Sequence, residues 1–251
     1  MKLEFLGEGP ALLVEEDRRH LVVADLHFGI EADLAAHGMH FRSRSAARVK
    51  RLMRMITATD PDALILLGDV KHSIPSLTRQ EFYELPGILT TLRDRVPLMV
   101  FPGNHDIGIE RYLRKEEIQH REGAIIDGVG YLHGHTYPSP GLMGNLIVCG
   151  HHHPLLVLRD EVGCALQGPA YVRAEVEVKR LVTGEVPEQA CTTRVLFVPA
   201  FNEIAGYDIR QIAKDPFAPL SKAMKLHTAE IILADGTYIG PLSMLHDDDD
   251  D

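Results

Sequence analysis

The sequence predicts an α/β protein in which two mixed β-sheets form the core and helices lie outside them, within one domain. Three observations lead to this fold class: continuous apolar runs that end in polar residues, amphipathic stretches between those runs, and a final third that is mostly strand-like. Unbroken runs such as ALILL, at residues 63–67, are typical of strands covered on both faces. A chain of 251 residues is long enough to bury such a core.

The first half of the chain alternates strands and helices. The predicted strands are LEFL near residue 3, ALLVEE near residue 11, HLVVAD ending at Asp25 and ALILLGD ending at Asp69. A helix is predicted from Ser43 to Thr59, because apolar residues recur there at intervals of three and four: Ala46, Val49, Leu52, Met53 and Ile56. Residues 77–95 predict a second helix, which Pro86-Gly87 should bend or break.

Later segments are short and increasingly strand-like. VPLMVF leads into the polar loop PGNHD, and a short helix is predicted over residues 109–115. Strands are then predicted at AIID, GYLHGH, NLIVCG, LLVLRD, AYVRAEVEV, TTRVLFVPAF, AEIILADG and TYIG. No internal repeat and no Gly- or Ser-rich linker divides the chain, so we expect one domain over residues 1–246, followed by a disordered acidic tail over residues 247–251.

The composition is that of a soluble globular protein with no membrane partner. Hydrophobic residues make up 45% and charged residues 25%, and no apolar run has the length of a membrane span. The net charge is −10, half of it from the terminal aspartates, which argues against broad electrostatic binding of DNA but allows a local basic patch. Cys149, Cys164 and Cys191 are odd in number and lack CxxC spacing, so we expect reduced thiols and a cytoplasmic location.

Seven potential metal ligands each follow a short apolar run, where a strand would deliver them to one edge of a sheet. They are Asp25, His27, Asp69, Asn104, His133, His151 and His153. Two aspartates, one asparagine and four histidines suit a pair of divalent cations, and paired cations suit phosphate-ester hydrolysis. Because the ligands are oxygen and imidazole without thiolate, we expect Mn²⁺, with Fe or Zn²⁺ as alternatives.

The spacing of these residues suggests how they divide between two cations. Asp25 and His27 are two positions apart, which in an extended strand directs both side chains to one side, and the same holds for His151 and His153. Asp69 follows a glycine and is placed to bridge both cations. The first cation would take Asp25, His27, Asp69 and His153, and the second would take Asp69, Asn104, His133 and His151.

The order of the motifs DLH, GD, GNHD, HGH and GHHH resembles the calcineurin-like metallophosphoesterases, whose pattern is DxH, GDxx, GNH[DE], H and GHxH. All five blocks are present between Asp25 and His153. The resemblance implies a four-layer α/β/β/α sandwich with a two-metal phosphoesterase centre at the strand ends. ADLHFG, LLGDVKH and VLFVPAFNEIAG are also similar to the ICC-like phosphoesterases of archaea and bacteria, which include DNA ligase-associated members.

The implied reaction is hydrolysis of a phosphate ester, with a phosphodiester as the expected substrate. Two cations would lower the pKa of a bridging water, and the resulting hydroxide would attack phosphorus in line. His105 would then donate a proton to the leaving alkoxide, and Asp106 would orient and support its imidazolium form. Substrates could include nucleotides or nucleic acids.

Three assignments have competing interpretations. In YLHGH the resemblance selects His133 as the ligand, while His135 would touch substrate or cap the following turn. His72 would face substrate at the mouth of the site or be an ordinary loop histidine. Arg44, Arg48 and Arg51, within the basic stretch Arg42–Arg54, share one helical face and would follow a nucleic-acid backbone or form a solvated surface.

Two other functions are consistent with this fold. One is a nuclease that processes DNA or RNA ends, although only 98 residues follow His153, which leaves little room for a DNA-engaging cap. The other is a non-catalytic interaction scaffold. The scaffold is disfavoured because every ligand position and the histidine of GNHD are present.

Overall fold

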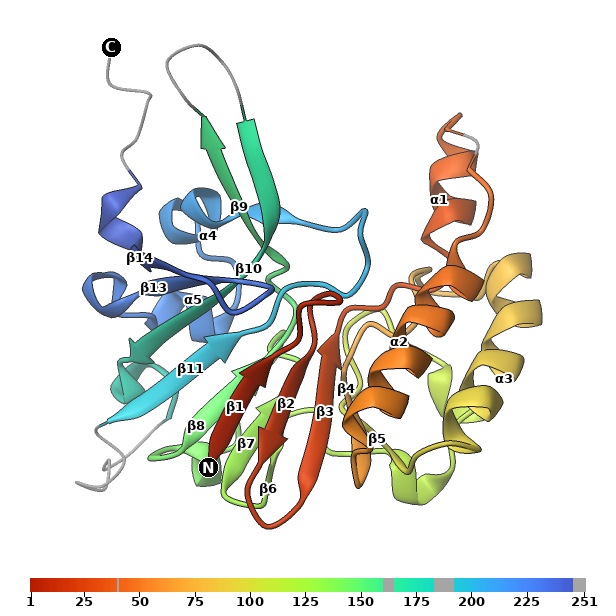
Figure 1. The fold of residues 1–251 in the computed structure, drawn as a ribbon, viewed down its shortest axis with the longest axis horizontal. Coiled ribbons are helices and arrows are strands. Elements are labelled where there is room, and N and C mark those ends of the chain that lie inside the picture. The colour runs from red at the N-terminus through yellow and green to blue at the C-terminus, as the bar shows by residue number, and fades with distance from the viewer. Residues whose placement is uncertain (40, 160–164, 183–191, 246–251) are drawn as a thin grey trace.

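The computed structural model describes residues 1–39, 41–159, 165–182 and 192–245, and places two mixed sheets face to face between helices (Figure 1). The predicted tail, Asp247–Asp251, lies outside the described residues, as do Cys164 and Cys191. Cys149 is a buried free thiol. No helix in the described ranges is both long enough and apolar enough to cross a membrane.

The smaller sheet has five strands in the order β1-β2-β3-β4-β5. Its strands are β1 (Lys2–Phe5), β2 (Leu12–Glu15), β3 (Arg19–Ala24), β4 (Ala63–Leu67) and β5 (Leu98–Val100). The first three are antiparallel, whereas β3, β4 and β5 are parallel neighbours. The carboxyl ends of these three strands therefore share one edge, where the loops carrying several candidate ligands begin.

The larger sheet has nine strands, with seven in the order β12-β9-β10-β11-β8-β7-β6, while β13 pairs with β10 and β14 pairs with β13. Its strands are β6 (Ala124–Ile126), β7 (Val129–Leu132), β8 (Leu146–Cys149), β9 (Pro154–Arg159), β10 (Ala165–Val176), β11 (Thr193–Phe197), β12 (Tyr207–Asp208), β13 (Glu230–Leu233) and β14 (Tyr238–Pro241). Because β7, β8 and β11 are parallel, their carboxyl ends also meet at one edge.

Helices cover the outer faces of both sheets. The α-helices are α1 (Ile30–Ala36), α2 (Ser45–Thr59), α3 (Arg79–Arg93), α4 (Ile209–Lys214) and α5 (Pro219–Ala223). Short 3₁₀ turns occur at Ile109–Arg111, Lys115–Glu117, Pro140–Leu142, Val178–Arg180, Leu226–Thr228 and Leu242–Met244. In Figure 1, α2 and α3 lie outside the smaller sheet, and α4 and α5 lie on the opposite side of the molecule. The predicted four-layer α/β/β/α arrangement is confirmed.

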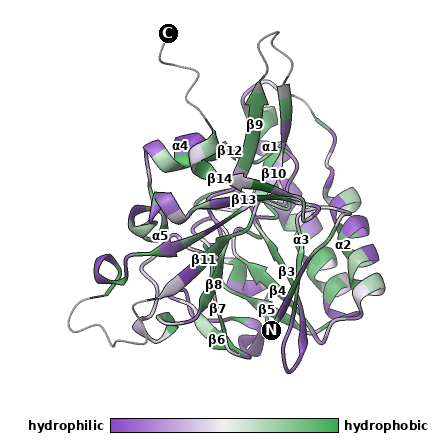
Figure 2. Ribbon diagram, turned by 60° about the vertical axis from the view of Figure 1, so that its left-hand side comes forward, coloured by the Kyte–Doolittle hydropathy of each residue, from purple (hydrophilic) through white to green (hydrophobic). Residues whose placement is uncertain are grey.

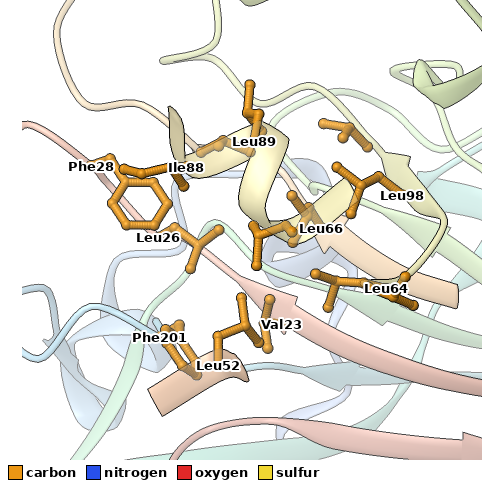
Figure 3. Close-up of a cluster of buried hydrophobic side chains, with 14 of the residues drawn as sticks. Val23, Leu26, Phe28, Leu52, Leu64, Leu66, Ile88, Leu89, Leu98 and Phe201 are labelled. Carbon is orange, nitrogen blue, oxygen red and sulfur yellow. The ribbon is translucent and has the colours of Figure 1, made fainter. Parts of the chain in front are cut away.

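The side-chain alternation of the strands divides the core into three apolar clusters. In β3, Val23 belongs to the cluster that also contains Leu52 of α2 and Leu89 of α3 (Figure 3), while its neighbour Val22 belongs to the cluster between the sheets. The third cluster joins the larger sheet to Ile209 and other residues of α4 and α5. In Figure 2 the central strands are mainly hydrophobic, whereas helices such as α2 are of mixed hydropathy. This alternation is the period of two that strand geometry imposes.

The predicted and observed elements differ in two respects. The break at Pro86 does not occur, and α3 runs continuously from Arg79 to Arg93. Proline has no N–H to donate to the carbonyl of Phe82, four residues earlier, but Phe82 lies on the exposed face of the helix, where that carbonyl is not left buried without a partner. Helices α1, α4 and α5 are not predicted by the sequence, since stretches of five to seven residues are too short to display a helical period.

The two sheets are joined directly at the edge that carries the candidate ligands. Ala24, at the end of β3, forms an isolated parallel bridge with Ala200, which follows β11. The N–H of Phe201 donates to the carbonyl of Ala24 at 2.8 Å, and the N–H of Val198 donates to the carbonyl of Cys149 at 2.7 Å. The loops of both sheets are therefore held at fixed separation where they meet.

Candidate metal centre

The structure brings the seven predicted ligands together in two adjoining groups. Potential ligand atoms lie within 4.8 Å of one another in each group; the first group is Asp25, His27, Asp69 and His153, and the second is Asp69, His133 and His151. A third group, His27, His72 and His105, adjoins the first and contains no carboxylate. The seventh residue, Asn104, places its Oδ1 3.2 Å from Nε2 of His133. Asp69 belongs to the first and the second group, so it is the carboxylate that two cations would share.

The ligand-bearing loops have an unusual backbone conformation. Asp25, His27, Asp69, His151 and His153 all have φ between 44° and 70°, the left-handed region that residues other than glycine rarely adopt. Our expectation that extended strands aim these pairs is therefore wrong, because β3 ends at Ala24 and β8 ends at Cys149. The strands end one residue early, and left-handed turns direct the side chains inward. Strained conformations of this kind cluster at functional sites.

Two glycines allow the loops to approach one another. A Cβ on Gly68, which has a φ of 74°, would lie 2.4 Å from Nδ1 of His133, and a Cβ on Gly103 would lie 2.1 Å from Oδ1 of Asp69. Both distances are far below van der Waals contact. The glycines of LLGD and PGNH therefore serve close packing around the central carboxylate.

The donor atoms fit divalent cations. Oδ2 of Asp25 accepts the backbone N–H of His151 at 2.9 Å. Its Oδ1 is buried, has no hydrogen-bond partner among the described residues, and lies 3.2 Å from Nε2 of His153. Nε2 of His153 in turn lies 3.4 Å from Nε2 of His27. Two ring nitrogens and a carboxylate oxygen therefore converge, and a cation would satisfy their lone pairs together.

His133 has its ring orientation fixed by the backbone. Its Nδ1 donates to the carbonyl of Leu67 at 2.8 Å, which leaves Nε2 as the nitrogen on the side of Asn104 and Asp69. Burial lowers the pKa of His133, but the carboxylates of Asp69 and Asp25 outweigh it and raise the pKa to about 9. Without a cation, a protonated His133 would thus offset part of the negative charge at the centre.

His105 lies beside the two groups, and its contacts differ from those we expected. Its backbone N–H donates to Oδ1 of Asp69 at 2.9 Å, and its Nδ1 donates to the carbonyl of His72. The expectation that Asp106 orients the imidazole is wrong: the two carboxylate oxygens of Asp106 accept the backbone amides of Gly103 at 2.8 Å and Lys71 at 3.2 Å. Asp106 therefore braces the loop, and the carbonyl of His72 orients the ring.

His72 and His135, the two predicted substrate contacts, both lie at the edge of the centre. The ring of His72 stacks on His105 with centroids 5.2 Å apart, and its Nδ1 is 3.1 Å from Nδ1 of His27. The ring of His135 is half-buried, 5.1 Å from that of His133, and its Nδ1 has no hydrogen-bond partner within the described chain. Burial and the charge of His133 lower the pKa of His135 to about 4, so it is neutral near pH 7.

Comparison with known proteins decides the family. A sequence model of the calcineurin-like phosphoesterase family matches residues 18–169, which include all seven candidate ligands. The chain belongs to this family. Family membership indicates a hydrolase that acts on phosphoester bonds, and with the Asp and His groups it indicates binding of divalent metal.

Solved structures show how far the fold of this phosphoesterase extends. The crystal structure of Pseudomonas putida nuclease MPE is similar with a TM-score of 0.58 and 22% identity over 94% of each chain. YfcE, a phosphoesterase from E. coli, gives a TM-score of 0.36 and 16% identity over 56% of this chain and 73% of its own. No curated protein sequence gives a significant match. The nuclease structure shows that the fold continues beyond residue 169 to nearly the whole chain.

Two arginines of the predicted strip, Arg48 and Arg51, are engaged within the protein, whereas Arg44 is exposed. Arg48 is buried and pairs with Glu31 of α1 at 2.8 Å and with Glu203 at 3.0 Å. Arg44 also pairs with Glu203, at 2.9 Å. Arg51 donates to the carbonyl of Phe201 and lies over the ring of that residue. Arg48 and Arg51 hold α1, α2 and the segment after β11 together and are not free to bind nucleic acid, whereas Arg44 keeps the solvated position that was one of the two predictions.

Two positioning residues of the phosphoesterase were not identified from the sequence. Asn202 is buried, and its Nδ2 donates to the carbonyls of Leu26 at 3.0 Å and His27 at 3.3 Å. Glu81 is buried and accepts the backbone amides of His72 at 2.9 Å and Ser73 at 2.7 Å. Glu81 also forms a capping box with Thr78, and the sequence pattern T-x-x-E is the signal that could have identified this cap. No local sequence pattern identifies Asn202.

Proposed function

We propose that the protein is a dinuclear-metal-dependent phosphodiesterase. The observation that carries this proposal is the position of Asp69, whose carboxylate belongs to both ligand groups. Paired cations that share a carboxylate lower the pKa of a water molecule between them and neutralise charge on the phosphoryl oxygens of a substrate. We assign Asp25, His27, Asp69 and His153 to one cation, and Asp69, Asn104, His133 and His151 to the other.

The remaining residues would bind and protonate the substrate. His105 donates a proton to the leaving oxygen, and its Nδ1 contact with the carbonyl of His72 keeps the ring in position for that transfer. We assign substrate contacts to the imidazoles of His72 and His135 because neither belongs to a group that contains Asp69, and both rings lie beside the centre. His72 groups only with His27 and His105, which offer no carboxylate. Asp106 supports the reaction by holding the loop of residues 103–106.

Mn²⁺ is the cation that we propose, with Fe and Zn²⁺ as alternatives. The ligands are carboxylate and amide oxygens and imidazole nitrogens, and none of the grouped side chains is a thiolate. We also propose that the enzyme acts in the cytoplasm and without a membrane, since the one described cysteine is a free thiol.

A substrate panel tests the proposal. Purified protein, freed of metal and reloaded with Mn²⁺, Fe²⁺ or Zn²⁺, is assayed on bis(p-nitrophenyl) phosphate, on p-nitrophenyl phosphate, and on circular and linear DNA. We expect fast hydrolysis of the diester with two bound cations per chain. Faster cleavage of DNA than of the small diester would favour a nuclease, and full metal loading without any turnover would favour an interaction scaffold.

A further inference from the structure

A ring of the C-terminal third lies directly against a candidate metal ligand. Tyr207, at the start of β12, stacks on the imidazole of His153 with centroids 5.8 Å apart and an interplanar angle of 27°. Its backbone is fixed as well, because the N–H of Tyr207 donates to the carbonyl of His153 at 2.9 Å and β12 pairs with β9. Tyr207 therefore has a fixed distance from the metal centre.

A second ring approaches the other ligand group. Phe217 lies 5.3 Å from the ring of His151 and 5.0 Å from that of His152. The rings of Phe217 and Tyr207 are 6.1 Å apart. Together they line a hollow of about 270 Å³, whose other walls are Gln211, Ile212 and Asp215. One hollow thus has aromatic rings that touch a histidine of each ligand group.

Both rings remain accessible despite these contacts. Tyr207 is 54% exposed and Phe217 is 45% exposed, whereas the aromatic residues of the core, such as Tyr171 and Phe201, are fully buried. Core packing therefore does not account for them. Both residues also lie beyond residue 169, outside the part of the chain that the family model matches. The hollow therefore lies in the part of the chain that the family model does not describe.

We propose that Tyr207 and Phe217 form a stacking subsite for an unpaired nucleobase attached next to the phosphate that reacts. This inference rests on the proposed phosphodiesterase function and names its substrate class as nucleotidyl phosphodiesters. Aromatic side chains bind bases through their flat faces with little regard to sequence. A base in a duplex has both faces stacked on its neighbours, so only a base in a single strand or at an open end fits.

The dimensions and the lining of the hollow agree with this occupant. Its volume is below the range of about 300–1,000 Å³ that is typical of pockets for drug-sized ligands, so a single heterocycle suits it better than a larger group. Ile212 adds an apolar surface, while Gln211 and Asp215 supply hydrogen-bonding groups at the wall. Asp215 is the one charged residue of this lining, so the hollow itself offers no cation to the phosphates of a duplex.

A binding experiment tests the subsite without requiring turnover. The probe is a 2-aminopurine dinucleotide in which a methylene group replaces the leaving oxygen, added to protein loaded with diamagnetic Zn²⁺. The chain has no tryptophan, and 2-aminopurine loses fluorescence when it stacks on an aromatic ring. We expect quenching with the unmodified protein and a loss of quenching in Tyr207→Leu and Phe217→Leu. Tyr207→Phe keeps the aromatic ring, so it should quench the fluorescence of the probe as strongly as the unmodified protein does.

A kinetic experiment then connects the subsite to the reaction. The substrates are a single-stranded oligonucleotide and the same strand with an abasic residue beside the cleaved phosphate, assayed with Mn²⁺. Loss of one base–aromatic stack corresponds to roughly 5- to 150-fold in affinity. We therefore expect kcat/KM to fall by about tenfold or more on the abasic strand, and expect both leucine variants to lose that preference. Thermal melting and bound metal should be unchanged in these variants.

The outcomes separate the subsite from the proposed function. Quenching that is equal in the original protein and both leucine variants, or an unchanged preference for the intact base, would overturn the subsite even if diesters are hydrolysed. Quenching that depends on both rings in a protein without any diesterase activity would support a nucleobase-binding site and refute the phosphodiesterase. No quenching with the unmodified protein would also overturn the subsite.

Discussion

The imidazole of His105 donates its Nδ1 proton to the backbone carbonyl of His72. A carbonyl oxygen offers no proton, so this contact assigns the tautomer and leaves Nε2 as the nitrogen that can exchange a proton with substrate. Asp106, the neighbour of His105, joins the loop after β5 to the loop after β4, because its carboxylate accepts the backbone amides of Gly103 and Lys71. The position of the His105 ring, and with it the direction in which Nε2 can transfer a proton, therefore depends on how these loops are held.

The first prediction concerns this histidine. In His105→Ala we expect turnover of a phosphodiester to fall by about 10²- to 10⁴-fold, the usual contribution of a general acid, because the leaving oxygen loses its proton donor. Bound metal should be nearly unchanged, since His105 is in neither group that contains Asp69, and its own group, with His27 and His72, has no carboxylate. Parallel metal analysis and steady-state kinetics measure both quantities. The exposed His227→Ala is the control, and wild-type turnover in His105→Ala would remove this residue from the mechanism.

The second prediction concerns the shared carboxylate. Asp69→Asn should lose cations from both groups, because the amide has no negative charge to divide between them. His151→Ala touches only the second group and should retain close to one cation per chain. Metal stoichiometry after dialysis distinguishes the two variants. Retention of one full cation by Asp69→Asn would mean that Asp69 does not bridge.

The third prediction compares one substitution at two glycines. Gly103→Ala should abolish metal binding and activity, because the added methyl group would meet Oδ1 of Asp69 at 2.1 Å. Gly87→Ala lies in the exposed middle of α3 with nothing within 4 Å, and should increase the free energy of unfolding by about 0.5–1 kcal/mol through helix propensity. Chemical denaturation and metal analysis of both variants test this. Equal metal binding and equal stability in Gly103→Ala and Gly87→Ala would contradict this prediction.

The fourth prediction concerns acid stability. Arg93 hydrogen-bonds the carboxylate of Glu117 at 2.6 Å and 2.9 Å, and this contact holds the pKa of Glu117 below its usual value. A lowered folded-state pKa stabilises the protein above the unfolded value, near 4.3, and the contribution is lost as the pH falls through the folded value. Glu117→Gln should therefore have a lower free energy of unfolding than the original protein at pH 7. The difference between the two free energies should become smaller as the pH falls. Denaturant titrations at several pH values measure that difference. A constant difference would contradict the assignment.

The sequence predicted the features that follow from where strands end and from the order of the motifs. Apolar runs located β3, β4 and β8, and the polar residues that follow them meet at one edge as expected. The local geometry could not be predicted in the same way, because the left-handed conformations of Asp25 and His151 are imposed by packing across loops. The contact of Arg48 with Glu203 and the contacts of Asn202 were also hidden, since they join residues 155 to 176 positions apart.

Asn202 fastens the loop that carries His27, and Ala200 bridges to Ala24 beside it. Residues 200–202 thus tie the loop of Asp25 and His27 to the segment after β11, so ligands from near the start of the chain depend on its last quarter for their final placement.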